Sequence, residues 1–275
     1  MIVDRLKKDH QLSERAACRV INMSRSVYHY QPDTEKDMPV ISALQGLLED
    51  YPAYGFLKLF TLLRQAGYRW NHKRVHRIYC ALGLNMRRKG KKRLPSRFPC
   101  PLDVPAQPNT SWSMDFMSDS LYEGRSFRTF NVIDDYNREV LAIEIDLSLP
   151  AQRVIRTLDR IVEWKGYPHQ LRCDNGPEFI SLALAQWAEE HGVHLEFIKP
   201  GTPTQNAYVE RFNRTYRTEV LDFYVFHTLT EVREITEKWM QQYNYERPHE
   251  ALNNQSPMSY KEANFKLENS NLAWH

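Results

Sequence analysis

The chain has 275 residues, of which 42% are hydrophobic and 26% are charged, so it can form a sizeable core, and its length suits two or three domains. No apolar run approaches the roughly 20 residues of a membrane span, and we expect no secretory signal because the first ten residues are mostly charged. The four cysteines are scattered without a Cys-x-x-Cys pair, which argues against a disulfide framework and favours a reducing cytoplasm.

The positive charge of the chain is concentrated in its first 100 residues. The formal net charge is only +3, but residues 1–100 hold 20 Lys/Arg and 8 Asp/Glu, a net charge of +12, whereas residues 101–275 carry −9. This asymmetry predicts a basic half that binds nucleic acid and an acidic half that could hold metal ions. A basic half that is merely solvated is the alternative.

Two helical units are predicted at the N-terminal end. Apolar residues at helical spacing, with Ser13 and Ser24 as helix caps, predict a short helix-turn-helix over residues 12–31. We assign it to a first domain of residues 1–37. Three further helices are predicted in a second domain, residues 38–85. Together the two domains would form an all-α, helix-turn-helix DNA-binding region.

One helix of the second domain, residues 71–82, combines metal-ligand types with basic side chains. His72, His76 and Cys80 stand four residues apart on one face, a spacing able to bind zinc. The basic residues beside them are Lys73, Arg74 and Arg77. Because only three ligands are visible, we favour a DNA-facing or half-buried surface over a zinc site.

A basic, proline-rich segment follows at residues 86–109. It contains five prolines, and prolines at this density oppose both helix and sheet. Its basic residues are Arg87, Arg88, Lys89, Lys91, Lys92, Arg93 and Arg97. Such clustering favours phosphate binding over a plain solvated surface. We therefore expect an extended basic linker between domains.

After the linker the pattern changes from helical periodicity to short strands. Strands are predicted over residues 112–121, 127–134, 139–146, 169–174 and 194–199, and helices over residues 150–165 and 181–191 and around Glu210. The order β-β-β-α-β-α-β-α is that of an RNase H-like fold, a mixed five-stranded sheet flanked by helices. We assign residues 110–221 to this core and residues 222–275 to a C-terminal helical extension and tail.

Three carboxylates of the core can meet at one point. Asp115 and Asp174 lie on predicted strands, and Glu210 lies on a predicted helix, with 35 residues between the last two. Hard oxygen ligands suit Mg²⁺ or Mn²⁺, and two such ions could clamp the attacking and leaving oxygens of a phosphodiester. Cys173 should point away from this site into the core, because strand neighbours alternate faces. Asp134 is only a weak spare ligand.

The helix of Glu210 carries further polar side chains. Helical spacing places Asn213, Arg214 and Arg217 on the same face as Glu210. With Gln205 in the preceding loop, they would look toward a DNA backbone that crosses the metal site. An ordinary i,i+4 ion pair between Glu210 and Arg214 is the alternative, and it is favoured for Arg214 taken alone. The combination with the three acids favours the functional interpretation.

Four motifs give the chain a specific resemblance. They are Trp112-Ser113-Met114-Asp115-Phe116, Val132-Ile133-Asp134-Asp135-Tyr136-Asn137-Arg138, Cys173-Asp174-Asn175-Gly176-Pro177-Glu178-Phe179 and Asn206-Ala207-Tyr208-Val209-Glu210-Arg211-Phe212-Asn213. They resemble the integrase catalytic core of the DDE superfamily, in particular the OrfB-type transposases of the IS-three family of bacterial insertion sequences. Residues 243–249 are similar to the segment that ends these proteins, and residues 54–84 are similar to their central helix-turn-helix domain.

The resemblance implies a DDE transposase. Asp115, Asp174 and Glu210 would be the catalytic ligands of two Mg²⁺ or Mn²⁺ ions, and Arg217 would contact transposon-end DNA. Water would cleave the element's end and free a 3′-OH, which would then attack another phosphodiester. The implied partners are double-stranded DNA of the terminal inverted repeats and of the target, with at least a dimer of the protein and no membrane. We expect a bacterial cytoplasmic, nucleoid-associated enzyme.

Two other functions stay open on the residues alone. A DNA-binding regulator without chemistry would fit the basic half, but the three intact acids disfavour it. A nuclease of RNase H type would share the fold and the metals, but two DNA-binding units and a basic linker favour a nucleoprotein assembly. The chain has no heptad run that could form a leucine zipper. Whether full activity needs a frameshift-fused upstream segment therefore stays open as well.

Overall fold

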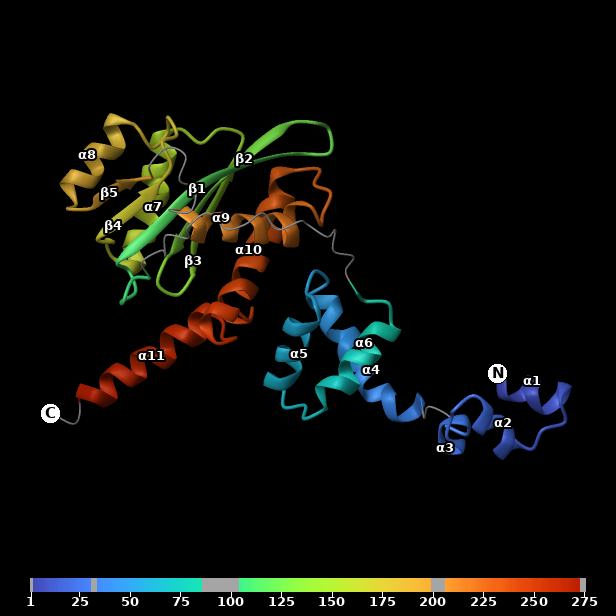
Figure 1. Cartoon of the computed structure of the whole chain (residues 1–275). Coiled ribbons are helices and arrows are strands. Elements are labelled where there is room, and N and C mark those ends of the chain that lie inside the picture. The colour runs from blue at the N-terminus through green and yellow to red at the C-terminus, as the bar shows by residue number, and fades with distance from the viewer. Residues whose placement is uncertain (1, 31–33, 86–103, 199–205, 273–275) are drawn as a thin grey trace. The chain divides into compact units, whose positions relative to one another are not determined.

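The computed structural model (Figure 1) describes residues 2–30, 34–85, 104–198 and 206–272. The chain folds into two compact units. The first comprises residues 1–50 and 70–85, and the second comprises residues 51–69 and 86–275. Within the described ranges, no helix is both long enough and apolar enough to cross a membrane.

The first unit begins with three short helices, α1 (Ile2–Asp9), α2 (Glu14–Val20) and α3 (Arg25–Tyr28). Helix α1 was not predicted, whereas α2 and α3 form the predicted helix-turn-helix. The side chain of Ser13 accepts a hydrogen bond from the Ala16 amide, and that of Ser24 accepts one from the Val27 amide. Both predicted caps are therefore confirmed. The helices share a small core built around Val3, Ala17 and Cys18.

Two longer helices complete the first unit, α4 (Thr34–Asp50) and α6 (His72–Ala81). They pack against each other. Helix α4 buries Val40 and Leu44, and α6 buries Val75 and Ile78. These apolar residues recur at helical spacing, which is why the sequence pattern located both helices.

The second unit is built on a five-stranded mixed sheet. Its strands are β1 (Ser111–Ser120), β2 (Ser126–Asp134), β3 (Val140–Asp146), β4 (Gln170–Cys173) and β5 (His194–Phe197). Their order in the sheet is β3-β2-β1-β4-β5. Strand β2 is antiparallel to both of its neighbours, whereas β4 is parallel to β1 and to β5. The predicted mixed five-stranded sheet is confirmed.

Helices cover both faces of this sheet (Figure 1). They are α7 (Ala151–Lys165), α8 (Leu182–Glu190), α9 (Ala207–Tyr216) and α10 (Leu229–Tyr245). One core joins Trp112 and Met114 of β1 to α7 and α8. The other core lies on the opposite face, where Phe127 and Ile133 of β2 pack against α9 and α10. Because strand side chains alternate between faces, Asp115 points to the side of α9.

Four shorter or peripheral elements belong to the same unit. They are α5 (Phe56–Gln65), a π-helical turn η2 (Arg217–Leu221), a 3-10 turn η3 (Glu250–Leu252) and α11 (Pro257–Leu272). Residues 51–69, which include α5, group with the second unit, and the boundaries of the 38–85 domain stay a prediction. The Lys58 ammonium of α5 lies 2.9 Å from the Glu219 carboxylate of η2.

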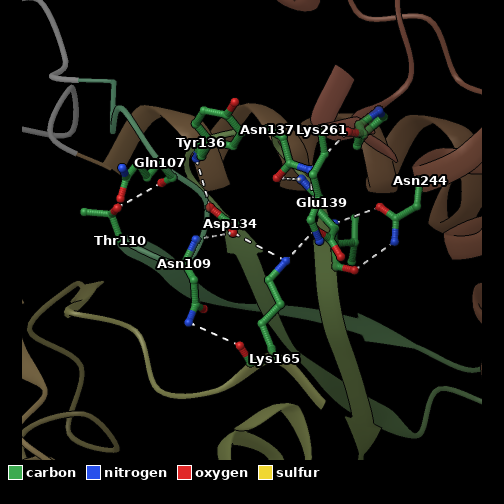
Figure 2. A network of polar contacts seen from close by, with 12 residues as sticks. Gln107, Asn109, Thr110, Asp134, Tyr136, Asn137, Glu139, Lys165, Asn244 and Lys261 are labelled. Carbon is green, nitrogen blue, oxygen red and sulfur yellow. Dashed lines mark hydrogen bonds and ion pairs between the residues drawn. The ribbon is translucent and has the colours of Figure 1, made fainter. Parts of the chain in front are cut away.

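A buried polar network joins the ends of β2 and β3 to the helices around them (Figure 2). The Lys165 ammonium of α7 lies 2.5 Å from Glu139 and 3.5 Å from Asp134. Asp134 also accepts a hydrogen bond from the Asn109 amide at 2.9 Å, and Lys261 of α11 lies 3.6 Å from Glu139. The carboxylate of Asp134 is thus engaged in holding the fold together, away from α9.

Candidate active site

Asp115 lies in the middle of β1 and is fastened at both carboxylate oxygens. The Phe116 amide donates a hydrogen bond to Oδ1 at 2.8 Å, and the Asn213 side chain donates one from Nδ2 to Oδ2 at 2.7 Å. Burial, and after it the charges of Asp174 and Glu210, raise the pKa of Asp115 to about 6. The charges of the two other acids therefore act on Asp115 in the same direction as its burial.

Asp174 directly follows β4, the parallel neighbour of β1. Its Oδ1 accepts a hydrogen bond from the Gly176 amide at 2.9 Å. A Cβ atom at position 176 would lie 3.0 Å from that same oxygen, so a larger residue there would press on the Asp174 carboxylate. Cys173, one residue before, is fully buried in the core between β1 and α7, and burial raises the pKa of its thiol to about 12. The prediction that Cys173 points away from the site is confirmed.

Glu210 is exposed on the first turn of α9. The helix is fixed against the sheet by apolar residues, chiefly Val209, Phe212 and Tyr216. Polar contacts fix it as well, because Asn206 at its start donates a hydrogen bond to the Met114 carbonyl at 3.3 Å. Helix α9 is therefore attached to β1 beside Asp115, which brings its acid to the same side of the sheet.

The three acids form a donor set that suits a hard divalent cation. Asp115, Asp174 and Glu210 offer carboxylate oxygens, which are the ligands that Mg²⁺ and Mn²⁺ prefer. A nearby cation would relieve the mutual repulsion that contributes to the raised pKa of Asp115. Among the residues that the structure describes, however, no three His, Cys, Asp or Glu side chains stand close enough together to hold a metal ion. The ligand types therefore suit Mg²⁺ or Mn²⁺, but the three carboxylates do not lie within reach of a single ion.

The structure places the predicted DNA-contact residues of α9 and η2 differently from one another. Asn213 is buried, and its Oδ1 accepts a hydrogen bond from Asn131 at 2.7 Å while its Nδ2 serves Asp115. Arg217 donates to Asp119 Oδ2 at 3.0 Å and to the Ser118 carbonyl at 2.8 Å, both in β1. Arg214 is exposed. Asn213 and Arg217 thus make hydrogen bonds to β1 or β2, whereas the Arg214 side chain is exposed to solvent.

The other predicted DNA contacts divide into two groups. On α6, Lys73 is exposed, and Arg74 and Arg77 form ion pairs with Asp37 of α4 at 3.1 and 2.7 Å. His72 and His76 are exposed on the same helix, with their rings stacked. The remaining predicted residues lie outside the described ranges: Gln205, Arg87, Arg88, Lys89, Lys91, Lys92 and Arg93.

Sequence reasoning missed the residue that supports Asn213. Asn131 lies directly opposite Asp115 in the β1–β2 pairing and is fully buried. An amide between the apolar residues Phe130 and Val132 was the available signal, because a buried polar side chain needs a partner. The chain of contacts from Asn131 through Asn213 to Asp115 links two strands and α9.

Comparison with known proteins decides the family. Models of an integrase core domain match residues 105–203 and 191–257, and a model of an HTH-like domain matches residues 36–92. The chain is 40% identical over 256 residues to the insertion element IS407 uncharacterized 31.7 kDa protein of Burkholderia multivorans, which covers 93% of this chain and 92% of that protein. The chain belongs to the OrfB-type transposases of the IS-three family of bacterial insertion sequences. It is therefore a DDE transposase.

Further matches come from other insertion elements and from a solved structure. The insertion element IS476 uncharacterized 39.2 kDa protein of Xanthomonas euvesicatoria is 35% identical, over 98% of this chain and 78% of that protein. The putative transposase InsK for insertion sequence element IS150 of Escherichia coli is 24% identical, over 94% and 96%. Among solved structures, the HTLV-2 integrase catalytic core domain in complex with magnesium covers 57% of this chain, with a TM-score of 0.47 and 14% identity.

The family to which the chain belongs indicates the reaction that the enzyme catalyses. An OrfB-type transposase of the DDE superfamily cuts DNA at the ends of an insertion sequence and joins the freed strand to other DNA, with a requirement for divalent metal. The HTH-like domain adds DNA binding to the integrase core.

Proposed function

We propose that Asp115, Asp174 and Glu210 are the catalytic residues of this transposase and the ligands of two Mg²⁺ or Mn²⁺ ions. The observation that carries the proposal is the hydrogen bond from Asn213 to Asp115 at 2.7 Å. It fastens α9 to β1 one helical turn after Glu210, beside a carboxylate whose pKa is raised by burial and, after it, by the other two acids. A carboxylate with a raised pKa and two acids from separate elements acting on it is typical of a catalytic site.

The residues of the chain perform the positioning part of the reaction. The two amide donors on Asp115 hold its oxygens in one orientation, and the Gly176 amide does the same for Asp174. The bound ions would neutralise charge on the scissile phosphate and lower the pKa of the attacking water. Water then breaks the phosphodiester at the element's end, and the freed 3′-OH displaces a second phosphodiester in-line, so one bond forms for each that breaks.

The remaining chain supplies the DNA-binding parts in this proposal. Residues 1–37 and 38–85 would hold the terminal inverted repeats, the basic linker at residues 86–109 would follow the phosphate backbone, and residues 110–221 would carry the chemistry. Joining two element ends requires at least two copies of the enzyme. We also propose that it acts on nucleoid DNA in the bacterial cytoplasm.

A cleavage assay with labelled element-end DNA tests the three acids. We expect Mg²⁺-dependent cleavage by the wild-type chain, and a loss of at least about 10³-fold in Asp115→Asn and Glu210→Gln, as is usual when a catalytic group is removed. Glu237→Gln is the matched control, since it neutralises an exposed acid on α10 and should cleave at the wild-type rate. Cleavage that persists in both site variants would refute the assignment.

A further inference from the structure

The C-terminal segment that resembles the end of family proteins places a buried arginine beside the catalytic helix. Arg247 is buried, and it holds the carboxylate of Glu219 with two nitrogens. Its Nη2 donates to Oε1 at 2.9 Å, and its Nε donates to Oε2 at 3.2 Å. Trp239 of α10 donates to the same Oε2 at 3.2 Å. A two-pronged guanidinium contact of this kind fixes direction as well as charge.

The buried carboxylate of Glu219 is ionised because of these partners. Burial by itself opposes the charged form, but the charge and the hydrogen bonds of Arg247, and after them those of Lys58, lower the pKa of Glu219. The Lys58 ammonium lies 2.9 Å from Oε1. A buried carboxylate left without a cation would be strongly unfavourable, and Glu219 has two cations, Arg247 and Lys58.

Glu219 lies in the π-helical turn η2, which continues directly from α9. Turns of this type are rare, and they frequently mark functional sites. Opposite sides of the turn are fastened to different elements, because Arg217 binds Asp119 and Ser118 of β1 while Glu219 binds Arg247. Strand β1 also carries Asp115, four residues before Asp119. The turn therefore fixes the end of α9 relative to the strand of Asp115.

Release of Glu219 would let this turn close to α-helical geometry. One residue more or less in a helical turn rotates the parts on either side by about 100° relative to each other. Helix α9 would then rotate or slide against β1, and Glu210 would move with it. Because Asn213 is on the same helix, its contact with Asp115 would be disturbed as well.

We propose that Arg247 is a positioning residue for the active site, which holds Glu219 in the π-helical turn and thereby sets the place of Glu210 beside Asp115. This inference rests on the proposed metal-ligand role of the three acids. It gives a function to the Tyr243–His249 segment, which lies outside the proposed acid site.

Metal binding separates positioning from plain stability. Arg247→Lys keeps the buried charge and removes the two-pronged contact, and Glu219→Gln keeps the size of the side chain and removes its charge. Mn²⁺ binding to the full chain would be measured by calorimetry, and thermal unfolding would be measured alongside. We expect both variants to bind Mn²⁺ at least about 10-fold more weakly, the usual effect of losing a partner that orients a metal ligand.

Lys165→Met is the matched control, because it removes another buried cation from the second unit. Lys165 belongs to the network of Asp134 and Glu139 (Figure 2) and touches neither α9 nor the three acids. This variant should unfold at a lower temperature and bind Mn²⁺ within about twofold of the wild type. Wild-type Mn²⁺ affinity in Arg247→Lys and Glu219→Gln, or an equal loss in Lys165→Met, would overturn the positioning role.

The same titrations separate this inference from the proposed function. If the wild type binds no Mn²⁺, or if Asp115→Asn binds it as the wild type does, the metal-ligand assignment fails and the positioning role fails with it. If Asp115→Asn abolishes binding and Arg247→Lys leaves it unchanged, only the positioning role fails.

Discussion

At the scale of single residues, the site depends on amides that orient acids. Asp115 is held by the Asn213 side chain, and Asn213 is held in turn by Asn131. Each bond is short and lies in or next to the core, where an unmet polar group would be costly. Burial, and after it the two other acids, raise the pKa of Asp115 to about 6, whereas the hydrogen bonds from Phe116 and Asn213 act against that rise and hold the carboxylate in one orientation.

Asn213→Ala tests this role of the amide. The hydrogen bond from Asn213 lowers the pKa of Asp115 against the effect of burial, so its loss should raise that pKa above about 6. Protons would then compete with metal at higher pH. We expect the acid limb of Mn²⁺ binding, measured by calorimetry between pH 5 and 8, to move upward by up to about one pH unit.

Asn244→Ala is the control for that shift. Asn244 also joins a helix to the sheet, by donating to the Val140 carbonyl at 2.9 Å, but it does not contact Asp115. It should keep the wild-type pH dependence. An unchanged profile in Asn213→Ala would show that the amide does not tune Asp115.

The three acids could be identified from the sequence, but the contacts that Asn213 and Arg217 make with β1 could not. Asp115, Asp174 and Glu210 stand in motifs whose spacing is visible along the chain. Helical periodicity predicted Asn213 and Arg217 on the face of Glu210. It could not tell whether that face meets DNA or protein, because the strand that receives both side chains lies about 100 residues earlier in the chain.

At the scale of elements, strands and helices with clear periodicity were predicted within a few residues. The five strands, α7, α8 and α9 follow from apolar alternation or helical spacing with glycine at the turns. The π-helical turn η2 had no such signal. It depends on the partners of Arg217 and Glu219, which come from β1, α5, α10 and the segment at Arg247, and only the folded chain brings these together.

The segment after α10 makes stability depend on pH. His249 lies next to Arg247, and burial, with the charge of Arg247 after it, lowers the pKa of His249 to about 2. The folded protein therefore keeps this imidazole neutral, whereas the unfolded chain protonates it near pH 6.5. The neutral His249 imidazole therefore contributes fully to the free energy of unfolding above about pH 6.5. This contribution is lost progressively as the pH falls toward 2, by about 1.4 kcal/mol per pH unit.

His249→Gln should remove this loss. Between pH 7.5 and 5 we expect the wild type to lose about 2 kcal/mol more of its free energy of unfolding than the variant does, as measured by denaturant titration. His194→Gln changes an exposed histidine on β5 and should behave as the wild type. Equal losses in wild type and His249→Gln would contradict a neutral imidazole at His249 in the folded protein.

At the scale of the whole molecule, the N-terminal and C-terminal parts of the chain carry opposite net charges. The net charge of +12 in residues 1–100 and −9 in the remainder matches an HTH-like domain followed by an integrase core. Composition showed this division before any fold was known. The ion pair of Lys58 with Glu219 could not be predicted from composition, because a single contact leaves no trace in it.

Strand joining tests the central claim most directly. An element-end duplex that already exposes its 3′-OH would be incubated with the full chain, target DNA and Mg²⁺, beside an identical duplex with a 3′-deoxy end. A transposase predicts joined products from the 3′-OH duplex alone, and none with EDTA or with Asp115→Asn. Metal-dependent hydrolysis of both duplexes without any joined product would instead indicate a nuclease, and it would contradict the account.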